Sequence, residues 1–108
     1  MTVQIEKVSY YRKRLNKLFV SVDGCFNDVP FDAILTFNRA TGDKFIQWFQ
    51  LVPKNEEQDK ITKELYQKFG RVIPKKGYAE THMHMLSQED ISHIILSVDS
   101  IGWDNLKR

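Results

Sequence analysis

The chain has 108 residues, of which 42% are hydrophobic and 28% are charged, and its formal net charge is only +2. This length fits a single domain over residues 1–108, and the composition excludes a disordered chain, which combines few apolar residues with a high net charge. The small net charge excludes recruitment to nucleic acid or membrane by overall charge alone, so local clusters of charge decide that question.

Three features of the sequence predict the cellular compartment of the protein. The longest apolar stretch, residues 45–52, is broken by Gln47 and Gln50 and is far shorter than the about 20 residues of a membrane span. The amino terminus carries polar and charged residues where a signal peptide has an apolar core. A single cysteine, Cys25, is typical of a reducing compartment. We therefore expect a cytoplasmic protein without a membrane segment.

The first strands are predicted from residues that alternate between apolar and polar. Residues 3–10 form the first predicted strand, and residues 18–22, in which every second residue is Leu or Val, form the second. Asp23 and Gly24 follow, a dipeptide that is typical of tight turns. We therefore expect the chain to turn back at these two residues.

The clearest strand pattern spans 29–37, where apolar residues occupy every second position. Residues 38–43 contain Asn, Gly and Asp and predict the loop of a hairpin. Residues 45–52 would be the return strand, although their apolar residues also fit the spacing of a helix. The pattern leaves these two alternatives open.

Two helices are predicted in the second half of the chain. The first spans 55–69, with Asn55 as its amino-terminal cap and Gly70 at its end. The second spans 88–99 and follows the cap residue Ser87.

Short apolar runs at 71–73 and 78–85 predict further strands between the two helices. Together these elements predict an α+β fold, in which an antiparallel meander of about four to six strands packs against the two helices.

The predicted sheet has more large apolar side chains than one face can hold. If the apolar row of 29–37 faces the helices, alternation puts other apolar residues on the opposite, outer face. We expect the following residues there: Phe19, Ile34, Ile46 and Trp48. A partner would cover them, and a symmetric homodimer is the commonest such assembly. The alternative is a three-layer monomer with one helix on each face.

A Glu-x-His-x-His run predicts a metal site as an alternative function. On a strand, alternate residues share a face, so Glu80, His82 and His84 would project together. Two imidazoles and a carboxylate suit zinc or iron, and His93 of the following helix would add a ligand. A remaining coordination position would hold a water that the metal activates, so the alternative is a metal-binding protein or a metal-dependent enzyme. The competing interpretation places both strand histidines on a solvated face, and the protein then needs no cofactor.

A basic and aromatic stretch predicts a third kind of function. Residues 10–17 would form a hairpin tip whose cations bind phosphate and whose rings stack on nucleic-acid bases. The residues concerned are Tyr10, Tyr11, Arg12, Lys13, Arg14 and Lys17. The same stretch also fits an ordinary polar loop, since Lys and Arg at sheet edges discourage aggregation.

The common catalytic signatures are missing from the sequence. It contains no phosphate-binding loop, no paired Cys-x-x-Cys and no His-Glu-x-x-His motif. Asp28 with Asp32, or Cys25 alone, are candidate reactive groups, but no neighbouring base or cation in the sequence activates them. The sequence therefore favours a non-enzymatic interaction protein, self-associating through the outer face, over the metal-binding and nucleic-acid-binding alternatives.

Overall fold

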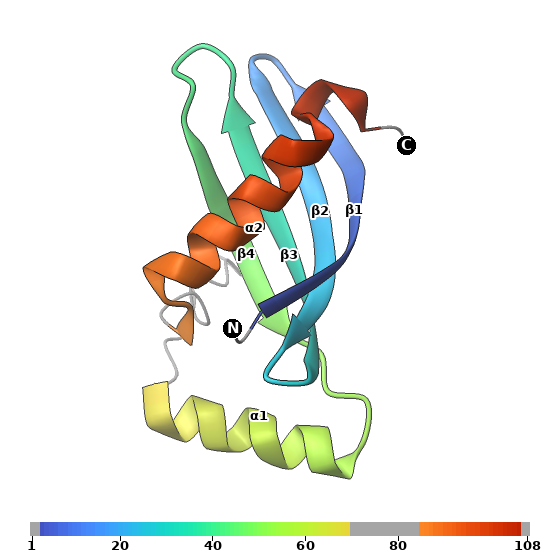
Figure 1. The fold of residues 1–108 in the computed structure, drawn as a ribbon, viewed down its shortest axis with the longest axis vertical. Helices are drawn as coiled ribbons and strands as arrows, with labels where there is room; N and C mark the ends of the chain where they lie inside the picture. Colours follow the sequence, from blue (N-terminus) through green and yellow to red (C-terminus); the bar gives the residue numbers. More distant parts are fainter. Residues whose placement is uncertain (1–2, 70–84, 107–108) are drawn as a thin grey trace.

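In the computed structural model, which describes residues 3–69 and 85–106, the chain forms an antiparallel sheet and two helices (Figure 1). The strands lie side by side in chain order and are β1 (Val3–Arg14), β2 (Lys17–Phe26), β3 (Val29–Asn38) and β4 (Lys44–Leu51). The helices are α1 (Glu56–Phe69), α2 (Gln88–Ile101) and the short 3₁₀ helix η3 (Trp103–Asn105). The α+β fold predicted from the sequence is confirmed.

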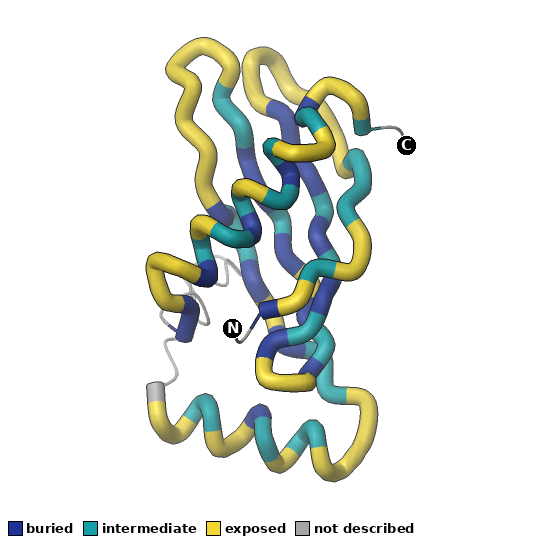
Figure 2. Tube along the Cα trace, in the orientation of Figure 1, coloured by how far each residue is buried: buried dark blue, intermediate teal, exposed yellow. Residues whose placement is uncertain are grey.

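Helix α2 crosses one face of the sheet, which we call the inner face, and the core lies between them. The helix contacts both edge strands, β1 and β4, because the sheet curves around it (Figure 1). Alternate strand residues turn toward this core, since the side-chain period of a strand is two. Fully buried members include Val20, Leu35 and Phe49 of the sheet with Ile94 and Val98 of α2. Figure 2 shows this buried trace along the middle of the sheet and one side of α2.

The turn between β2 and β3 differs from the prediction. Strand β2 continues past Asp23 and Gly24, and the chain turns instead at Asn27 and Asp28, whose φ angles are 49° and 67°. Two consecutive residues with positive φ are typical of a type I′ hairpin turn, and Asn and Asp tolerate that conformation. The predicted turn at Asp23 and Gly24 is therefore wrong.

Gly24 is required by space rather than by a turn. A Cβ atom at this position would overlap the backbone carbonyl oxygen of Gln4 and lie 2.9 Å from the ring of Phe31. Only glycine therefore lets β1 and the core ring approach this part of β2 so closely.

Residues 45–52 form a strand rather than a helix, and that strand contains a bulge. The register between β3 and β4 shifts between Ile34 and Leu35, so that Gln47 is an extra residue. Trp48 consequently pairs with Ile34 on the outer face, while Ile46 pairs with Leu35 and belongs to the inner core. The prediction that Ile46 lies on the outer face is wrong, because a period of two does not continue across a bulge.

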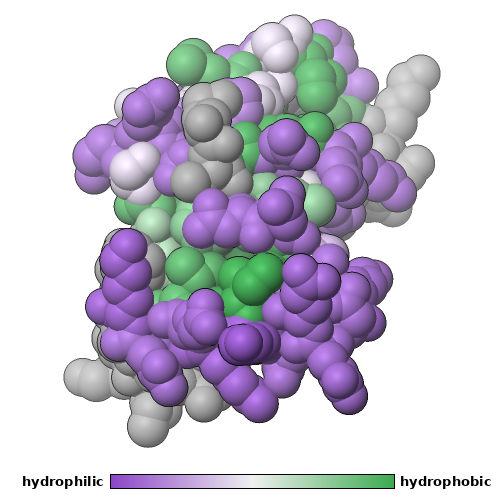
Figure 3. Space-filling model, turned by 60° about the horizontal axis from the view of Figure 1, so that its bottom comes forward, coloured by the Kyte–Doolittle hydropathy of each residue, from purple (hydrophilic) through white to green (hydrophobic). Residues whose placement is uncertain are grey.

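Helix α1 lies below the end of the sheet that carries the β2–β3 turn (Figure 1). The Asn55 side chain caps it by accepting the Gln58 backbone N–H at 2.9 Å, and the Gln58 side-chain amide donates to the Asp28 carbonyl at 3.3 Å. Ile61 and Leu65 pack against the core from this side. Figure 3, a view of this lower end, shows apolar side chains gathered among hydrophilic ones.

Helix α2 is fixed at both ends. The predicted cap residue Ser87 forms a capping box with Asp90, in which each side chain accepts the other residue's backbone N–H. Near the other end, Asp99 accepts hydrogen bonds from the Trp103 indole at 2.6 Å and the Lys44 ammonium at 2.9 Å. Burial alone would raise the pKa of Asp99, but these two donors lower it. The carboxylate therefore stays charged and ties α2 to β4.

Other predictions fall partly or wholly beyond the described residues. Gly70 and the strand predicted at 71–73 lie outside them, as does the strand predicted at 78–85 except for Met85, which is buried in the core. No helix in the described part is long and apolar enough to cross a membrane.

Candidate functional site

The outer face of the sheet is the face opposite to α2, and neither helix of the described part lies on it (Figure 1). The antiparallel registers arrange its side chains in rows that cross the strands. Three consecutive rows are, first, Arg12, Phe19, Thr36 and Phe45; second, Ser9, Ser21, Ile34 and Trp48; third, Lys7, Asp23, Asp32 and Gln50. An apolar centre row thus separates a basic and aromatic row from a row with two carboxylates.

The basic stretch predicted as a hairpin tip is mostly strand, because only two residues form the β1–β2 loop. Tyr10 and Lys13 take register positions of the inner face, whereas Arg12, Arg14 and Lys17 take positions of the outer face. We call these last three residues the basic end of the outer face. Alternation divides the residues of this stretch between two faces, and their role in nucleic-acid binding stays a prediction.

A groove of about 1000 Å³ opens at the basic end. Its walls include the three cations of the basic end and Phe45, which keeps 46% of its surface exposed. The guanidinium carbon of Arg12 lies 4.8 Å from the centre of the Phe19 ring, and Phe19 is only 6% exposed. Outside the groove lining, Tyr11 precedes Arg12 on β1, is 53% exposed, and has its ring centre 6.0 Å from the Arg12 guanidinium carbon. The groove therefore combines positive charge with aromatic surface, as cation–π contacts require.

The centre row holds the apolar part of the face. Ile34 and Trp48 are direct cross-strand neighbours, and both are half-buried. In the adjacent row Thr36 is 1% exposed, and its hydroxyl donates to the Gln47 side-chain oxygen at 2.6 Å. The structure thus brings Phe19, Ile34 and Trp48 of the predicted interface together on one face.

Two carboxylates face each other at the opposite end of the outer face. Asp23 and Asp32 are direct cross-strand neighbours, an arrangement that weakens a sheet when both are charged. Burial raises the pKa of Asp23, and the hydrogen bond and charge of Asp32 raise it further, while Lys7 acts in the other direction. One proton is therefore retained by this pair more readily than by an isolated carboxyl.

Glu6 adds a third carboxylate near this pair. It lies at a register shift of β1 and accepts the Cys25 thiol at 3.3 Å. Burial raises the pKa of the Cys25 thiol, and Glu6 raises it further, so the thiol stays protonated and is a poor nucleophile. We call Glu6, Asp23 and Asp32 the acidic end of the outer face.

Sequence reasoning missed the Asp23 and Asp32 pair because it placed the turn at the wrong dipeptide. Once the turn is placed at Asn27 and Asp28, residues that are equally far from it on either side must pair, and Asp23 then opposes Asp32. The signal that would have found the pair was the Asn-Asp dipeptide between two apolar strands. Asp28 itself belongs to the turn and forms no pair with Asp32.

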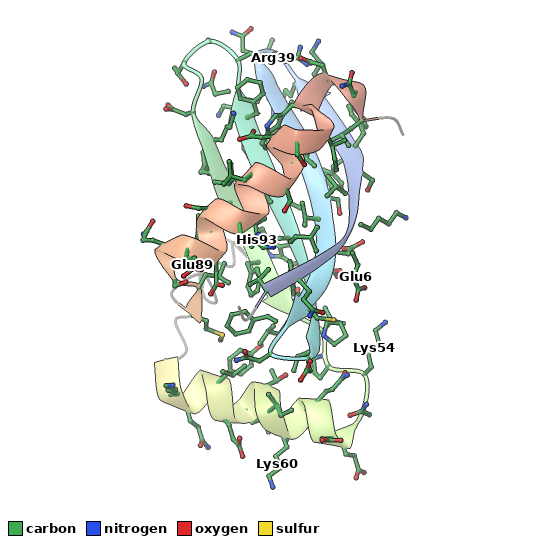
Figure 4. The ribbon with its side chains drawn as sticks, viewed as in Figure 1. Glu6, Arg39, Lys54, Lys60, Glu89 and His93 are labelled. Atoms are coloured by element: carbon green, nitrogen blue, oxygen red, sulfur yellow. The ribbon has the colours of Figure 1, made fainter. Side chains whose placement is uncertain are left out.

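The predicted metal site lies mostly outside the described residues. Glu80, His82 and His84 lie outside the described residues, and His93 is half-buried on α2 (Figure 4). Among residues 3–69 and 85–106, no group of three His, Cys, Asp or Glu side chains is arranged to hold a metal ion.

Comparison with known proteins adds no identification. No family model matches the chain, and no curated protein and no solved structure is significantly similar to it. What the outer face does must therefore follow from its own chemistry.

Proposed function

We propose that this chain is a non-enzymatic interaction protein that self-associates through the outer face of its sheet. The observation that supports the proposal is an apolar centre, Ile34 and Trp48, on a face that no described helix covers. Phe45 lies beside this centre and is 46% exposed. Contiguous apolar surface of this kind marks protein contacts, and aromatic residues are enriched at their centres.

The composition of the outer face differs from that of a sheet face that remains in water. Antiparallel sheets commonly leave one face solvated, but alternation then places polar residues on it. Here two adjacent rows carry four large apolar side chains, namely Phe19, Ile34, Phe45 and Trp48. This composition is expected if a partner covers the outer face in the functional protein.

Size-exclusion chromatography with light scattering over a range of concentrations tests the proposal. The wild-type chain should elute with about twice its mass of 12.7 kDa, and Trp48→Ser and Phe45→Ser should shift it toward the monomer. Leu96→Ser is the matched control, since Leu96 is an exposed apolar residue on α2, and it should leave assembly unchanged. Unchanged assembly and binding in both outer-face variants would reject the proposal.

A second candidate function is the binding of single-stranded nucleic acid. It is favoured by the groove at the basic end, where Arg12, Arg14 and Lys17 adjoin the exposed ring of Phe45. Affinity for a labelled oligodeoxythymidine, measured by fluorescence anisotropy, should then fall steeply with salt. The triple variant Arg12→Glu, Arg14→Glu and Lys17→Glu should abolish it, and equal affinity in this variant would exclude the candidate.

A further inference from the structure

We propose that two copies of this chain pack face to face about a two-fold axis that crosses the strands at the centre row of the outer face. Each copy then places its basic end on the acidic end of the other. The arrangement rests on the proposed function, because it specifies how a second copy sits on the same outer face.

Each charged end keeps an excess of one sign within the described part of the chain, although Lys7 lies in the row of Asp23 and Asp32. Arg12, Arg14 and Lys17 form no ion pair there, since the ion pairs between described residues all lie elsewhere. Asp23 and Asp32 oppose each other, and Lys7 is the cation that acts on Asp23. Opposite charges at the two ends of one face are what a self-complementary contact requires, because the same patch must serve on both subunits.

The spacing of the rows fits such an axis. Ser21 of the centre row lies midway along β2 between Phe19 and Asp23, two residues from each. At about 3.3 Å per residue, the rows of Phe19 and Asp23 are about 13 Å apart. A two-fold axis along the centre row therefore exchanges the basic row of one copy with the carboxylate row of the other.

The next rows outward are exchanged in the same way. Arg14 pairs with Lys17 at the basic end, and Cys25 lies equally far from the centre row in the other direction. Glu6 is in contact with Cys25. The outermost cations of one copy therefore meet the outermost carboxylate of the other, so charge complementarity extends over the length of the face.

Arg12 is already positioned for this contact. Its guanidinium carbon lies 4.8 Å from the centre of the Phe19 ring and 6.0 Å from that of the Tyr11 ring, so the charge leans from β1 toward β2. An axis that crosses the strands sets β2 of one copy on β2 of the other in the opposite direction. Because β1 likewise lies on β1, the partner's Lys7 stands opposite the strand position of Arg12. The Arg12 guanidinium, over Phe19, instead faces the partner's Asp23, and the partner's Asp32 is about 5 Å farther on the adjacent strand. The symmetric dimer contains this contact twice.

The apolar centre and the size of the face agree with the same arrangement. Ile34 and Trp48 lie in the centre row, so the axis brings these side chains of both copies together. Four strands about 4.8 Å apart and about 33 Å long give a flat area of roughly 600 Å², without side-chain relief or sheet curvature. This area is below the about 800 Å² that each partner buries in a standard interface and above the roughly 500 Å² per partner at the lower end of specific interfaces.

A nucleic-acid strand would complement the charge of only the basic end of the outer face. It would be attracted to the basic end, but the carboxylates of the acidic end would repel it, and the opposition of Asp23 and Asp32 would remain. A second copy brings a cation to the acidic end as well as a carboxylate to the basic end. The charge pattern therefore favours the second copy.

Two single charge reversals and their mixture test the arrangement. In Arg12→Glu, and likewise in Asp23→Lys, both contacts of a dimer join like charges, so each variant alone should dimerise at least about tenfold more weakly than wild type. An equimolar mixture of the two variants should recover the dimer, because each contact then joins an acidic and a basic side chain. Native mass spectrometry distinguishes the mixed dimer by mass, and sedimentation velocity gives the affinities.

Two further variants make the test independent of a single substitution. Arg14→Glu and Glu6→Lys form a second pair at exposed positions, for which the same recovery in the mixture is expected, and circular dichroism verifies that every variant is folded. Lys60→Glu is the matched control, because Lys60 points away from the sheet below α1 whereas Glu6 projects from β1 (Figure 4). It should leave dimerisation unchanged.

The possible outcomes separate this arrangement from the proposed function. If Trp48→Ser dissociates the dimer but neither mixture recovers it, the two-fold arrangement is overturned and self-association through the outer face stands. If the wild-type chain is monomeric at every concentration, both are overturned. If the chain is a monomer that binds oligodeoxythymidine through its basic end, the outer face binds nucleic acid instead of a second copy.

Discussion

Replacement of Gly24 by Ala tests how closely β1 packs on β2. The added Cβ would overlap the Gln4 carbonyl oxygen and lie 2.9 Å from the ring of Phe31. Neither neighbour moves easily, because the oxygen belongs to the backbone of β1 and Phe31 is buried and stacked on Phe49 at 4.9 Å. The substitution must therefore displace β1 from β2.

The size of the effect follows from these two contacts. Overpacking a core costs about 1–3 kcal/mol, and the loss of one or two ladder hydrogen bonds adds about 1 kcal/mol each, so the free energy of unfolding should fall by about 2–5 kcal/mol. Gly42→Ala is the matched control. Its Cβ would meet nothing within 4 Å, and only its φ of +79° opposes a side chain. That conformation costs about 1–2 kcal/mol.

Urea unfolding of both variants, followed by tryptophan fluorescence, measures the two losses. The wild-type chain should have the highest midpoint and Gly24→Ala the lowest, with similar denaturant slopes. Since β1 carries parts of both charged ends, Gly24→Ala should also weaken self-association. A loss of stability at Gly24 no larger than that at Gly42 would refute the argument that close strand approach requires this glycine.

Three further changes probe the turn, the carboxylate pair and the helix cap. Leu15→Gly should raise the free energy of unfolding by about 0.5–1 kcal/mol in urea unfolding, because Leu15 is 88% exposed and has a φ of 53° that glycine adopts more easily; a decrease would contradict this reasoning. The pKa of Asp23 is raised in the folded monomer, so the native state binds more protons than the unfolded chain and stability falls as pH rises from about 4 toward neutral. Asp32→Asn should make stability fall less with rising pH, as measured by thermal unfolding at concentrations where the protein is monomeric. Equal pH slopes for the wild type and Asp32→Asn would exclude the carboxylate pair as the cause of the decline. Ser87→Ala removes the hydrogen bond to the Asp90 backbone N–H and should lower stability by about 1 kcal/mol, seen as a lower urea midpoint; an unchanged midpoint would show that the cap contributes nothing.

The parts of the fold that could be predicted are those that depend on neighbouring residues. The alternation in β3 identifies a strand without knowledge of its partners, and Ser87 with Asp90 marks the start of α2 because a capping box spans only four positions. The same holds for Asn55, whose side chain caps α1 as predicted. The Gln58 side chain adds a second contact at this end, since it accepts the backbone N–H of Lys54.

The candidate site depends on pairing between strands, which a single sequence does not display. The bulge at Gln47 is defined by the pairing of β3 with β4, and it places Ile46 in the core instead of on the predicted outer face. The acidic end likewise required the register of β2 and β3, because Asp23 and Asp32 are nine positions apart in the chain yet direct neighbours in the sheet. The segregation of charge along the outer face is therefore a property of the register, not of local composition.

The register shifts near Glu6 and Tyr11 in β1, and at Gln47 in β4, fall on the two edge strands of the sheet. A regular edge presents evenly spaced N–H and C=O groups, onto which further strands add until fibres grow. A bulge interrupts that spacing after a few residues, so an incoming strand cannot continue its hydrogen-bond ladder. Lateral growth of this sheet is therefore obstructed on both sides. The proposed contact through the outer face would join two molecules without exposing a template for a third.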